Sequence, residues 1–307
     1  MNKQNWTLND IPDLIGKTII VTGANTGLGF ESVKAFAQNG ANVVMACRSF
    51  EKGEMARKQI IRLYPSSNIQ VMELDLADLK SIRNFAHTFR QSHAHVDVLL
   101  NNAAVMMAPF TKTKDGFESQ MGINYLGHFA LTGILLDLLK KTPGSRVVNV
   151  SSLSHKQGMM DFDNLLFENG KDYTSMKAYG RSKLSNLLFT FELQRFFESK
   201  GINCISVAAH PGISNTTKPS KKDTKLWNKF SKKIFTTVIQ PAVMGALPEI
   251  RASVDQNVRA GEYYGPGGLL ELAGYPVVVR PKLIAYDVEI AHKLFEVSEK
   301  LTSVTYK

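Results

Sequence analysis

The sequence predicts an α/β fold: a single domain in which an open, parallel sheet carries helices on both faces. Short β-branched runs alternate with segments whose apolar residues recur at helical spacing. Strands that alternate with helices in this way pair in parallel through right-handed crossovers. No linker or change of composition interrupts the alternation up to about Gly212, and 307 residues are enough for one large core.

Six strands are expected, most of them followed by a helix. In the first unit, the β-branched run "KTIIVTG" ends at a glycine, and the helical pattern of "FESVKAFAQNG" follows it. The strands are expected at residues 17–23, 41–47, 69–75, 96–103, 145–152 and 202–212. Helices are expected at residues 30–40, 51–64, 78–91, 124–141 and 240–254, with another around Tyr179, whereas residues 261–268, "GEYYGPGG", predict a loop.

The first predicted strand runs into "TGANTGLG", whose three glycines form the pattern G-x-x-x-G-x-G. Glycines let a turn adopt unusual backbone angles and let a pyrophosphate approach the amides at the positive end of the next helix. A turn between a first strand and a first helix is where this dinucleotide-binding fingerprint lies in a Rossmann-type, doubly wound sheet. Cofactor contacts are predicted from Gly23, Asn25, Gly27, Leu28 and Gly29.

The end of the second predicted strand bears on the choice of cofactor. Enzymes that use NAD usually place an acid there, about 20 residues after the glycine turn, to hold the ribose 2′-hydroxyl. This chain has Cys47, Arg48 and Ser49 instead. A guanidinium suits a 2′-phosphate, so NADP(H) is favoured over NAD(H), with Arg48 and Ser49 as contacts. The alternative is a surface arginine, and Glu51 is expected to be a first-turn helix acid.

The stretch "KDYTSMKAYGRSK" contains Tyr-x-x-x-Lys twice, as Tyr173 with Lys177 and as Tyr179 with Lys183. On a helix, the second pair lies on a polar strip beside an apolar stripe, whereas the first pair would fall within that stripe. Thr174 or the serine after it is a good N-cap, which leaves Tyr173 in the preceding loop. The second pair is therefore predicted to be the functional one.

With "NNAA" after the fourth predicted strand and "NVSS" after the fifth, these motifs resemble the short-chain dehydrogenase/reductase family from about Lys17 to Gly212. The segments "ACRSFEKGEMA", "INYLGHFALTGILL", "NVSSLSHKQG", "YGRSKLSNLLFTFEL" and "GEYYGP" resemble its retinol-dehydrogenase-like group and bacterial relatives. The resemblance implies an NADP(H)-dependent oxidoreductase that transfers a hydride between nicotinamide and a carbonyl or alcohol, here an apolar aldehyde, ketone or retinoid-like compound. The alternatives are a regulatory or scaffold protein that binds the cofactor without turnover, and a carbon–carbon double-bond reductase of the protochlorophyllide-reductase type.

The resemblance implies four catalytic residues: Asn124, Ser152, Tyr179 and Lys183. Tyr179 would exchange a proton with the substrate oxygen, and the Lys183 ammonium would bring the pKa of that phenol down from its ordinary value near 10. Lys183 would also donate to the nicotinamide ribose, and Ser152 would hold the substrate oxygen. Asn124 would order a water that leads protons to Lys183. The neighbouring Ser151 is an alternative to Ser152, and Asn124 could instead be a buried helix asparagine that satisfies backbone groups.

The resemblance also implies cofactor contacts beyond the glycine turn. These are Asp75, Leu76, Asn102, Ala103, Tyr179, Lys183, Pro211, Gly212 and Thr216. Asp75 would meet the adenine, and the segment from Pro211 to Thr216 would contact the carboxamide of nicotinamide. His210 is interpreted as structural. Ala104 stands where the family usually has glycine, and its methyl group would shift the cofactor slightly.

These motifs divide the single domain of residues 1–307 into three parts. Residues 16–212 form the dinucleotide-binding and catalytic core, residues 213–245 a substrate-covering insertion, and residues 246–307 the C-terminal completion. The family commonly pairs subunits through the helix that carries the tyrosine and the helix before it, so a homodimer or homotetramer is expected.

The formal net charge of +10 favours anionic partners, and part of it is local, because residues 218–233 hold seven lysines and one aspartate. If residues 225–235 are helical, apolar and lysine side chains fall on opposite faces. The segment is expected to cover the substrate pocket; peripheral contact with a membrane is the alternative. Nucleic acid is not expected as a partner, because no recognised binding motif accompanies the lysines.

The sequence predicts a cytoplasmic protein without a metal site. The start, "MNKQNWTLNDIP", lacks the apolar stretch of a secretory signal, and no segment approaches the ~20 apolar residues that span a bilayer. The two cysteines, Cys47 and Cys204, have no metal-ligand spacing and are expected to be reduced.

Overall fold

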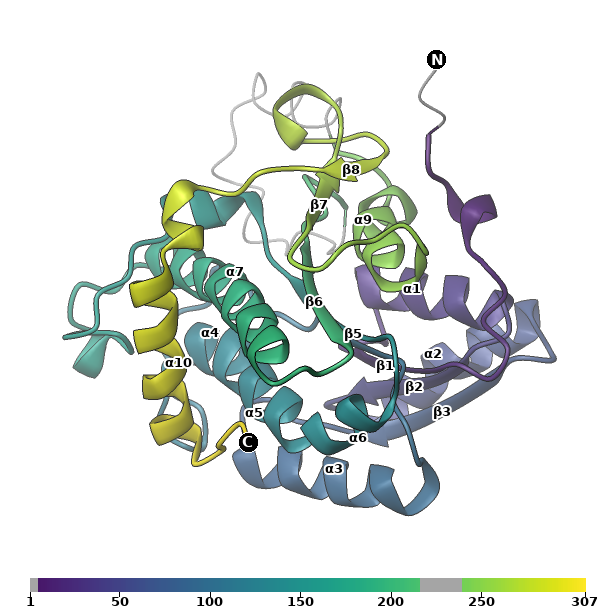
Figure 1. Cartoon of the computed structure of the whole chain (residues 1–307), viewed down its shortest axis with the longest axis horizontal. Coiled ribbons are helices and arrows are strands. Elements are labelled where there is room, and N and C mark those ends of the chain that lie inside the picture. Colours follow the sequence, from purple (N-terminus) through teal and green to yellow (C-terminus); the bar gives the residue numbers. More distant parts are fainter. Residues whose placement is uncertain (1–4, 216–238) are drawn as a thin grey trace.

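A computed structural model describes residues 5–215 and 239–307. In these residues one eight-stranded sheet crosses the molecule in the order β3-β2-β1-β4-β5-β6-β7-β8 (Figure 1). All neighbouring pairs from β3 to β7 are parallel, and β8 runs antiparallel to β7. The predicted single-domain, doubly wound α/β fold is confirmed, although the sheet is mostly rather than wholly parallel.

The described strands follow the predicted order. They are β1 (Thr18–Thr22), β2 (Asn42–Cys47), β3 (Asn68–Glu73), β4 (Val98–Asn101), β5 (Ser145–Val150), β6 (Cys204–Ala209), β7 (Tyr263–Pro266) and β8 (Pro276–Val278). The longer helices are α1 (Gly27–Gln38), α2 (Phe50–Leu63), α3 (Leu79–Ser92), α5 (Gly127–Ile134), α7 (Ser175–Ser199), α9 (Ala242–Val254) and α10 (Val288–Thr302). Short helical elements are η1 (Leu8–Asp10), α4 (Ser119–Met121), η2 (Gly122–Leu126), α6 (Leu136–Lys141), η3 (Leu153–Gln157), η4 (Glu168–Gly170), η6 (Leu269–Glu271) and η7 (Leu283–Tyr286).

The prediction of a loop at residues 261–268 was wrong, because this stretch contains β7. Its glycines and proline are turn signals, but Tyr263 and Tyr264 are each 1% exposed and pair with the end of β6. Aromatic residues fit the buried surface of a sheet, and here their burial outweighs the local turn propensity. The strand ends the sheet's parallel part, and Pro266 and Gly265 then pair with β8.

The single helix predicted at residues 124–141 is also divided in the structure. It begins with η2, a π-helical turn, continues as α5, and is interrupted at Leu135 before α6. The helix predicted at residues 240–254 is confirmed as α9. Helix α7 begins at Ser175 with Thr174 as its N-cap, as predicted, because the Thr174 hydroxyl accepts a hydrogen bond from the Lys177 amide.

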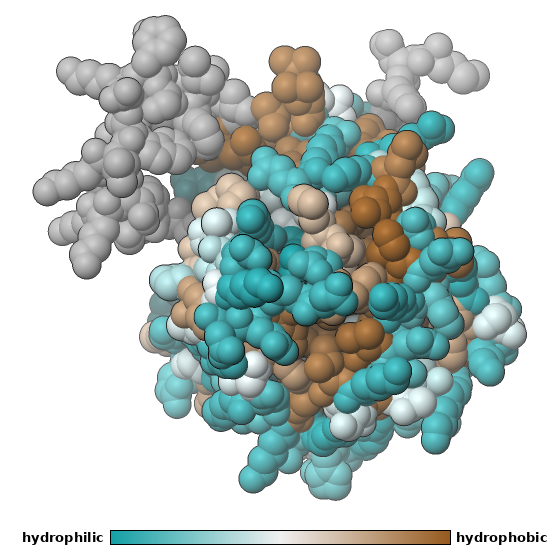
Figure 2. All heavy atoms as spheres, turned by 90° about the vertical axis from the view of Figure 1, so that its left-hand side faces the viewer, coloured by the Kyte–Doolittle hydropathy of each residue, from teal (hydrophilic) through white to brown (hydrophobic). Residues whose placement is uncertain are grey.

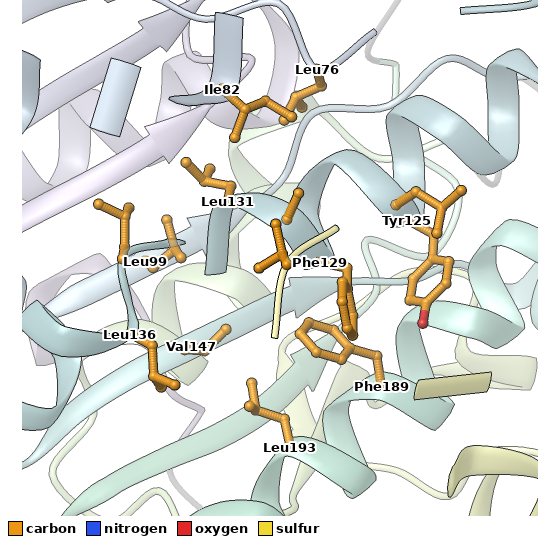
Figure 3. Close-up of a cluster of buried hydrophobic side chains, with 14 of the residues drawn as sticks. Leu76, Ile82, Leu99, Tyr125, Phe129, Leu131, Leu136, Val147, Phe189 and Leu193 are labelled. Atoms are coloured by element: carbon orange, nitrogen blue, oxygen red, sulfur yellow. The ribbon is translucent and has the colours of Figure 1, made fainter. Parts of the chain in front are cut away.

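Two apolar cores lie on the two faces of the sheet. One is formed with α1, α2 and α9, and the other with α3, α5, α7 and α10. Figure 3 shows part of the second core, where Phe129 of α5 lies against Phe189 of α7, with 5.3 Å between ring centroids. Leu99 of β4 and Val147 of β5 face the same core from the sheet.

The C-terminal helix α10 lies alongside α7 on the outer side of this second core (Figure 1). Phe295 of α10 is 5.0 Å from Phe129 between ring centroids, and the Tyr125 hydroxyl lies 2.6 Å from the Ser298 hydroxyl. Beyond the helix, the hydroxyl of Tyr306 donates to the carbonyl of Phe129. The chain thus covers its own α5 and α7 with its C-terminal segment.

Most of the predicted insertion, including the amphipathic stretch 225–235, lies outside the described residues. No helix within residues 5–215 and 239–307 has the length and apolar character needed to cross a membrane. The face in Figure 2 is a mosaic in which apolar residues reach the surface between polar ones.

Candidate active site

A cleft of about 960 Å³ lies beyond the carboxyl ends of β1, β4, β5 and β6. This is where open parallel sheets bind their ligands, because loops diverge there to either side of the sheet. Most of the predicted site residues line it. They are Gly23, Asn25, Gly27, Leu28, Arg48, Ser49, Asp75, Leu76, Asn102, Ala103, Pro211, Gly212, Ser152, Tyr179 and Lys183. Gly29 and Asn124 are not among the lining residues, and Thr216 lies outside the described part of the chain.

The glycine turn is packed closely against the loop after β4. Gly23 and Gly27 have φ of 65° and 60°, in the left-handed region that favours glycine. A Cβ on Gly29 would lie 2.6 Å from Asn102 Nδ2, so this glycine serves close packing rather than the cleft wall. The amides of Asn102 and Ala103 both donate to the Thr22 hydroxyl at 2.9 Å. The sequence analysis missed this role of Thr22, which ties the turn to the "NNAA" loop.

The turn fits a dinucleotide pyrophosphate. The N-cap of α1, Thr26, makes no capping hydrogen bond with its side chain to the described residues, so the first amides of α1 stay available. Unpaired amides at the positive end of a helix are a ready anion site. Gly27 and Leu28, which begin the helix, both line the cleft.

Two basic residues lie at the predicted adenosine end of the cleft, where the sequence predicted one. Arg48, just before the N-cap of α2, is exposed, and Lys52, in the first turn of α2, also lines the cleft. Ser49 is the N-cap of α2, since its hydroxyl accepts from the Lys52 amide and donates to Glu51 at 2.8 Å. Glu51 therefore belongs to the first turn of α2, as predicted. The available signal for the second cation was the closeness of Lys52 to Arg48 in the sequence.

Helix α7 carries Tyr179 and Lys183 to the part of the cleft that is predicted to be its reacting end. The Lys183 ammonium donates to the carbonyl of Val150 at 2.9 Å and lies 5.7 Å from the centre of the Tyr179 ring. Burial lowers the pKa of Lys183 to about 8, against the opposing effect of Glu249. Burial also raises the pKa of Tyr179 above its ordinary value, and a hydrogen bond with Ser152 acts in the opposite direction. The protein alone therefore keeps Tyr179 as a phenol, because desolvation outweighs its neighbours.

The two serines after β5 have different partners. The Ser151 hydroxyl is buried and donates to the carbonyl of Lys183 at 2.8 Å. The Ser152 hydroxyl accepts from the Ser154 amide at 3.2 Å as the N-cap of η3, and Ser152 lines the cleft beside Tyr179. The geometry thus favours Ser152 over Ser151 as the residue that meets a ligand.

Asn124 lies beneath the cleft, in the π-helical turn η2. Its side chain is fully buried, accepts from the Val105 amide at 2.8 Å, and donates to the Val105 carbonyl and to Ser182. These are the contacts of the alternative interpretation, a buried asparagine that satisfies backbone groups. They hold Val105, which lines the cleft, while the water-ordering role of Asn124 stays a prediction.

The other tyrosine–lysine pair is separated, as predicted. Tyr173 lies in the loop before α7, and its hydroxyl donates to the carbonyl of Ala108 at 2.6 Å and accepts from Gln120. Lys177 is exposed on the first turn of α7. Neither residue lines the cleft.

The reacting end of the cleft also has apolar walls that the sequence analysis did not identify. The apolar side chains there are Val105, Met106, Met107, Leu153, Ile213 and Leu272. They come from the loops after β4, β5, β6 and β7, which are far apart in the sequence. No local pattern marks such residues, because only the sheet brings their loops together.

Comparison with known proteins agrees with this geometry. A family model described as short chain dehydrogenase matches residues 17–164. Retinol dehydrogenase 11 of Mus musculus is 48% identical over 219 residues, which are 71% of this chain and 68% of that protein. Retinol dehydrogenase 13 of Homo sapiens is 39% identical over 295 residues, 94% of this chain and 85% of that protein. The crystal structure of an uncharacterized protein from Mycobacterium paratuberculosis has a TM-score of 0.82 at 36% identity, covering 99% of this chain and 100% of that one. The chain belongs to the short-chain dehydrogenase/reductase family, and retinol dehydrogenases are among its relatives.

Proposed function

We propose that this oxidoreductase is NADP(H)-dependent and interconverts an apolar carbonyl compound and its alcohol. The observation that carries the proposal is the convergence of Ser152, Tyr179 and Lys183 in one cleft that the glycine turn also lines. When bound, the nicotinamide would donate or accept the hydride at the carbonyl carbon. The chain's own residues then have to hold the substrate oxygen and move one proton.

Tyr179 and Ser152 are suited to these two tasks. The raised pKa of Tyr179 keeps its phenolic proton in place at neutral pH, so the side chain can donate to an oxygen that gains charge during reduction. Ser152 has a hydroxyl proton to donate to the same oxygen. The Lys183 ammonium, held on the carbonyl of Val150, stabilises the negative charge that Tyr179 acquires when its proton has left.

The preference for the phosphorylated cofactor rests on the two cations of the adenosine end. A 2′-phosphate carries negative charge that Arg48 can bind in a bidentate fashion, and Lys52 adds a second point charge. The substrate class rests on the apolar side chains at the reacting end, such as Met106, Leu153 and Leu272. Two relatives are named retinol dehydrogenases, so retinoids belong among the candidate substrates.

The test is a panel of aldehydes, ketones and retinoids, with consumption of NADPH and of NADH compared. Tyr179→Phe should lower kcat by about 10²–10⁴-fold, because the proton donor is removed, and should leave NADPH binding intact. The matched control is Tyr173→Phe, the same change in the other Tyr-x-x-x-Lys pattern, which should retain activity. Binding of NADPH without turnover on any substrate would contradict the proposal and favour a non-catalytic binder.

Arg48→Ala should raise the KM for NADPH about tenfold and leave the KM for NADH unchanged, since only NADPH has the 2′-phosphate. Arg62→Ala, in the last turn of the same helix α2, is the control, and both constants should stay at their wild-type values. Equal effects of Arg48→Ala on the two cofactors would remove the argument for NADP(H).

A further inference from the structure

The hairpin that joins β7 to β8 forms one wall of the cleft. Its loop, residues 267–275, carries Leu272, which lines the cleft directly after η6. The carbonyl of Leu272 accepts a hydrogen bond from the Ile213 amide at 2.7 Å. Residues 211–214 themselves line the cleft, so this bond joins two of its walls.

The hairpin tip is held in a conformation that its residues do not favour. Leu270 and Glu271 have φ of 52° and 60°, in the left-handed region, although neither is a glycine. Each such residue costs roughly 1–3 kcal/mol, so contacts elsewhere have to offset the strain. Leu269 and Leu270 do not provide them, because they are 84% and 72% exposed. Apolar residues reach the surface at the top of Figure 2, the end of the molecule where Figure 1 places the hairpin.

The offsetting contact is made by Glu271 with a buried histidine at the end of β6. Glu271 Oε2 lies 3.1 Å from His210 Nε2, and the His210 side chain is fully buried. Because His210 Nδ1 accepts from the Gly212 amide at 3.2 Å, the ring proton is assigned to Nε2, which faces the carboxylate. His210 is thus connected to a cleft wall on one side and to the hairpin on the other.

The space around this contact is tight. A Cβ on Gly265 would lie 2.0 Å from His210 Nε2, so the glycine lets the strand β7 pass over the ring. A Cβ on Gly212 would lie 2.3 Å from the carbonyl oxygen of Leu272. The close contact with His210 is the main reason that the pKa of Glu271 is lowered, which keeps the carboxylate ionised.

Glu271 also faces the third wall of the reacting end. Its Oε1 lies 3.8 Å from the ammonium of Lys156, in the short helix η3 that Ser152 caps. One carboxylate therefore lies between the loop that carries Ser152, the loop after β6 and the hairpin with Leu272.

We propose that Glu271 and His210 are positioning residues for the substrate end of the cleft. Their contact seats the β7–β8 hairpin so that Leu272 forms part of the apolar wall, and it thereby determines how tightly an apolar substrate binds. The effect on substrate rests on the proposed function, whereas the seating of the hairpin does not.

The position of the hairpin against the loop after β6 is tested by hydrogen–deuterium exchange, measured on the holoenzyme with NADPH and on the free protein. Glu271→Ala should speed exchange of the Ile213 amide about tenfold, because that amide is protected by the carbonyl of Leu272 and one supporting contact is lost. Glu271→Gln keeps a polar oxygen facing His210 Nε2 at the same distance and should stay near wild type. Glu289→Ala, which removes an exposed carboxylate on α10, is the control and should change nothing.

The effect on substrate is measured with straight-chain aldehydes of increasing length. Glu271→Ala should raise KM for the long aldehydes about tenfold and change kcat by less than about twofold, since the hairpin does not take part in proton transfer. Leu272→Ala should raise the same KM without speeding exchange at Ile213. It removes the apolar side chain that lines the cleft and keeps the backbone carbonyl that protects the Ile213 amide.

Unchanged exchange at Ile213 in Glu271→Ala would overturn the proposal. So would equal losses in the Ala and Gln variants, which would assign the effect to the charge facing Lys156 rather than to the contact with His210. If wild-type protein consumes no NADPH with any aldehyde, the proposed function fails, and the exchange measurement still decides the seating.

Discussion

The Lys183 side chain is 2% exposed, yet the proposed proton transfer depends on its charge. Burial places its pKa at about 8, so the ammonium loses its proton as the pH rises through that value. We expect kcat for carbonyl reduction to fall above about pH 8, because the neutral amine no longer stabilises the Tyr179 phenolate. A pH profile of single-turnover rates measures this. In the variant Lys183→Arg the side chain stays charged at high pH, so the rate should no longer fall above about pH 8, even if the rate is lower overall. A fall at the same pH in that variant would show that another group causes it.

Glu249 is a second buried charged residue, on α9. Its Oε1 accepts from the Ser32 hydroxyl at 2.7 Å, and burial raises the pKa of Glu249 to about 8 from 4.5. A raised folded-state pKa contributes stability that is fully present below pH 4.5 and is lost as the pH rises toward 8. Glu249→Gln keeps the acceptor without the charge, so it should raise the free energy of unfolding by ~1–3 kcal/mol at pH 8 and leave it unchanged at pH 4.

Urea denaturation at the two pH values checks this expectation, with Glu289→Gln on the surface as the control. A loss of stability at pH 8 would show that the Glu249 charge is needed in the fold. Since Glu249 also raises the pKa of Lys183, the same variant should move the fall in the reduction rate to lower pH.

At this scale the sequence was sufficient to place at one cleft the residues that belong to short motifs. Tyr179, Lys183 and two glycines of the turn, Gly23 and Gly27, line it, and their spacing along one helix or one turn made them candidates; their roles stay predictions. The roles of Thr22 and Leu272 could not be predicted, because they come from contacts with residues about 80 and 60 positions away along the chain. Ser152 was predicted over Ser151 from the resemblance, and the contact of Ser151 with the Lys183 carbonyl adds a structural argument for the same choice.

At the scale of elements, a row of side-chain hydrogen bonds ties the sheet to two helices. Asn101 of β4 donates to Asn149 of β5 at 2.9 Å and to Thr132 of α5, and Asn149 donates to Thr190 of α7 at 3.1 Å. All four side chains are buried. The row holds α7, and with it the proposed catalytic pair Tyr179 and Lys183, at a fixed position over the sheet.

We therefore expect Asn149→Ala to cost about 2–4 kcal/mol of unfolding free energy, because two buried polar groups lose their partner. Thr174→Ala, which removes the exposed N-cap of the same helix, should cost only about 1 kcal/mol. Urea unfolding compares the two variants. Equal costs would mean that water replaces the lost partners of Asn149.

The elements that the sequence predicted correctly are those with a clear period and ordinary boundaries. The six strands from β1 to β6 are of this kind, since β1, β2 and β6 are almost wholly buried runs and the edge strand β3 alternates between exposed and buried residues over its first four positions. Strands β7 and β8 were missed because Gly265, Pro266 and Pro276 are turn formers by local propensity. The long-range pairing of β7 with β6 makes β7 a strand, and β8 forms by pairing with β7.

At the scale of the whole molecule, α10 changes the expectation about oligomers. The helices through which the family commonly pairs are α5 and α7, and the chain covers them itself with Phe295 and Tyr306. A partner on that face would have to displace a buried aromatic cluster. We expect sedimentation velocity at micromolar concentration to show a monomer. A dimer would indicate that subunits pair through a different face. The variant Phe295→Ala tests this, because a dimer formed through α5 and α7 should become more stable when the packing of α10 is weakened.

The order of the strands has a consequence for how the chain folds. Central strand β1 pairs with β4, and this joins Ile19 to Val98, 79 positions along the chain. Contacts of such long range close slowly, because the loop entropy is lost before the pairing energy is gained. The glycine turn obtains its final shape only when Gly23 meets Ala103, so it should be among the later parts to form during synthesis and refolding. A refolding chain should therefore bind a dinucleotide only after strand β4 has paired with β1.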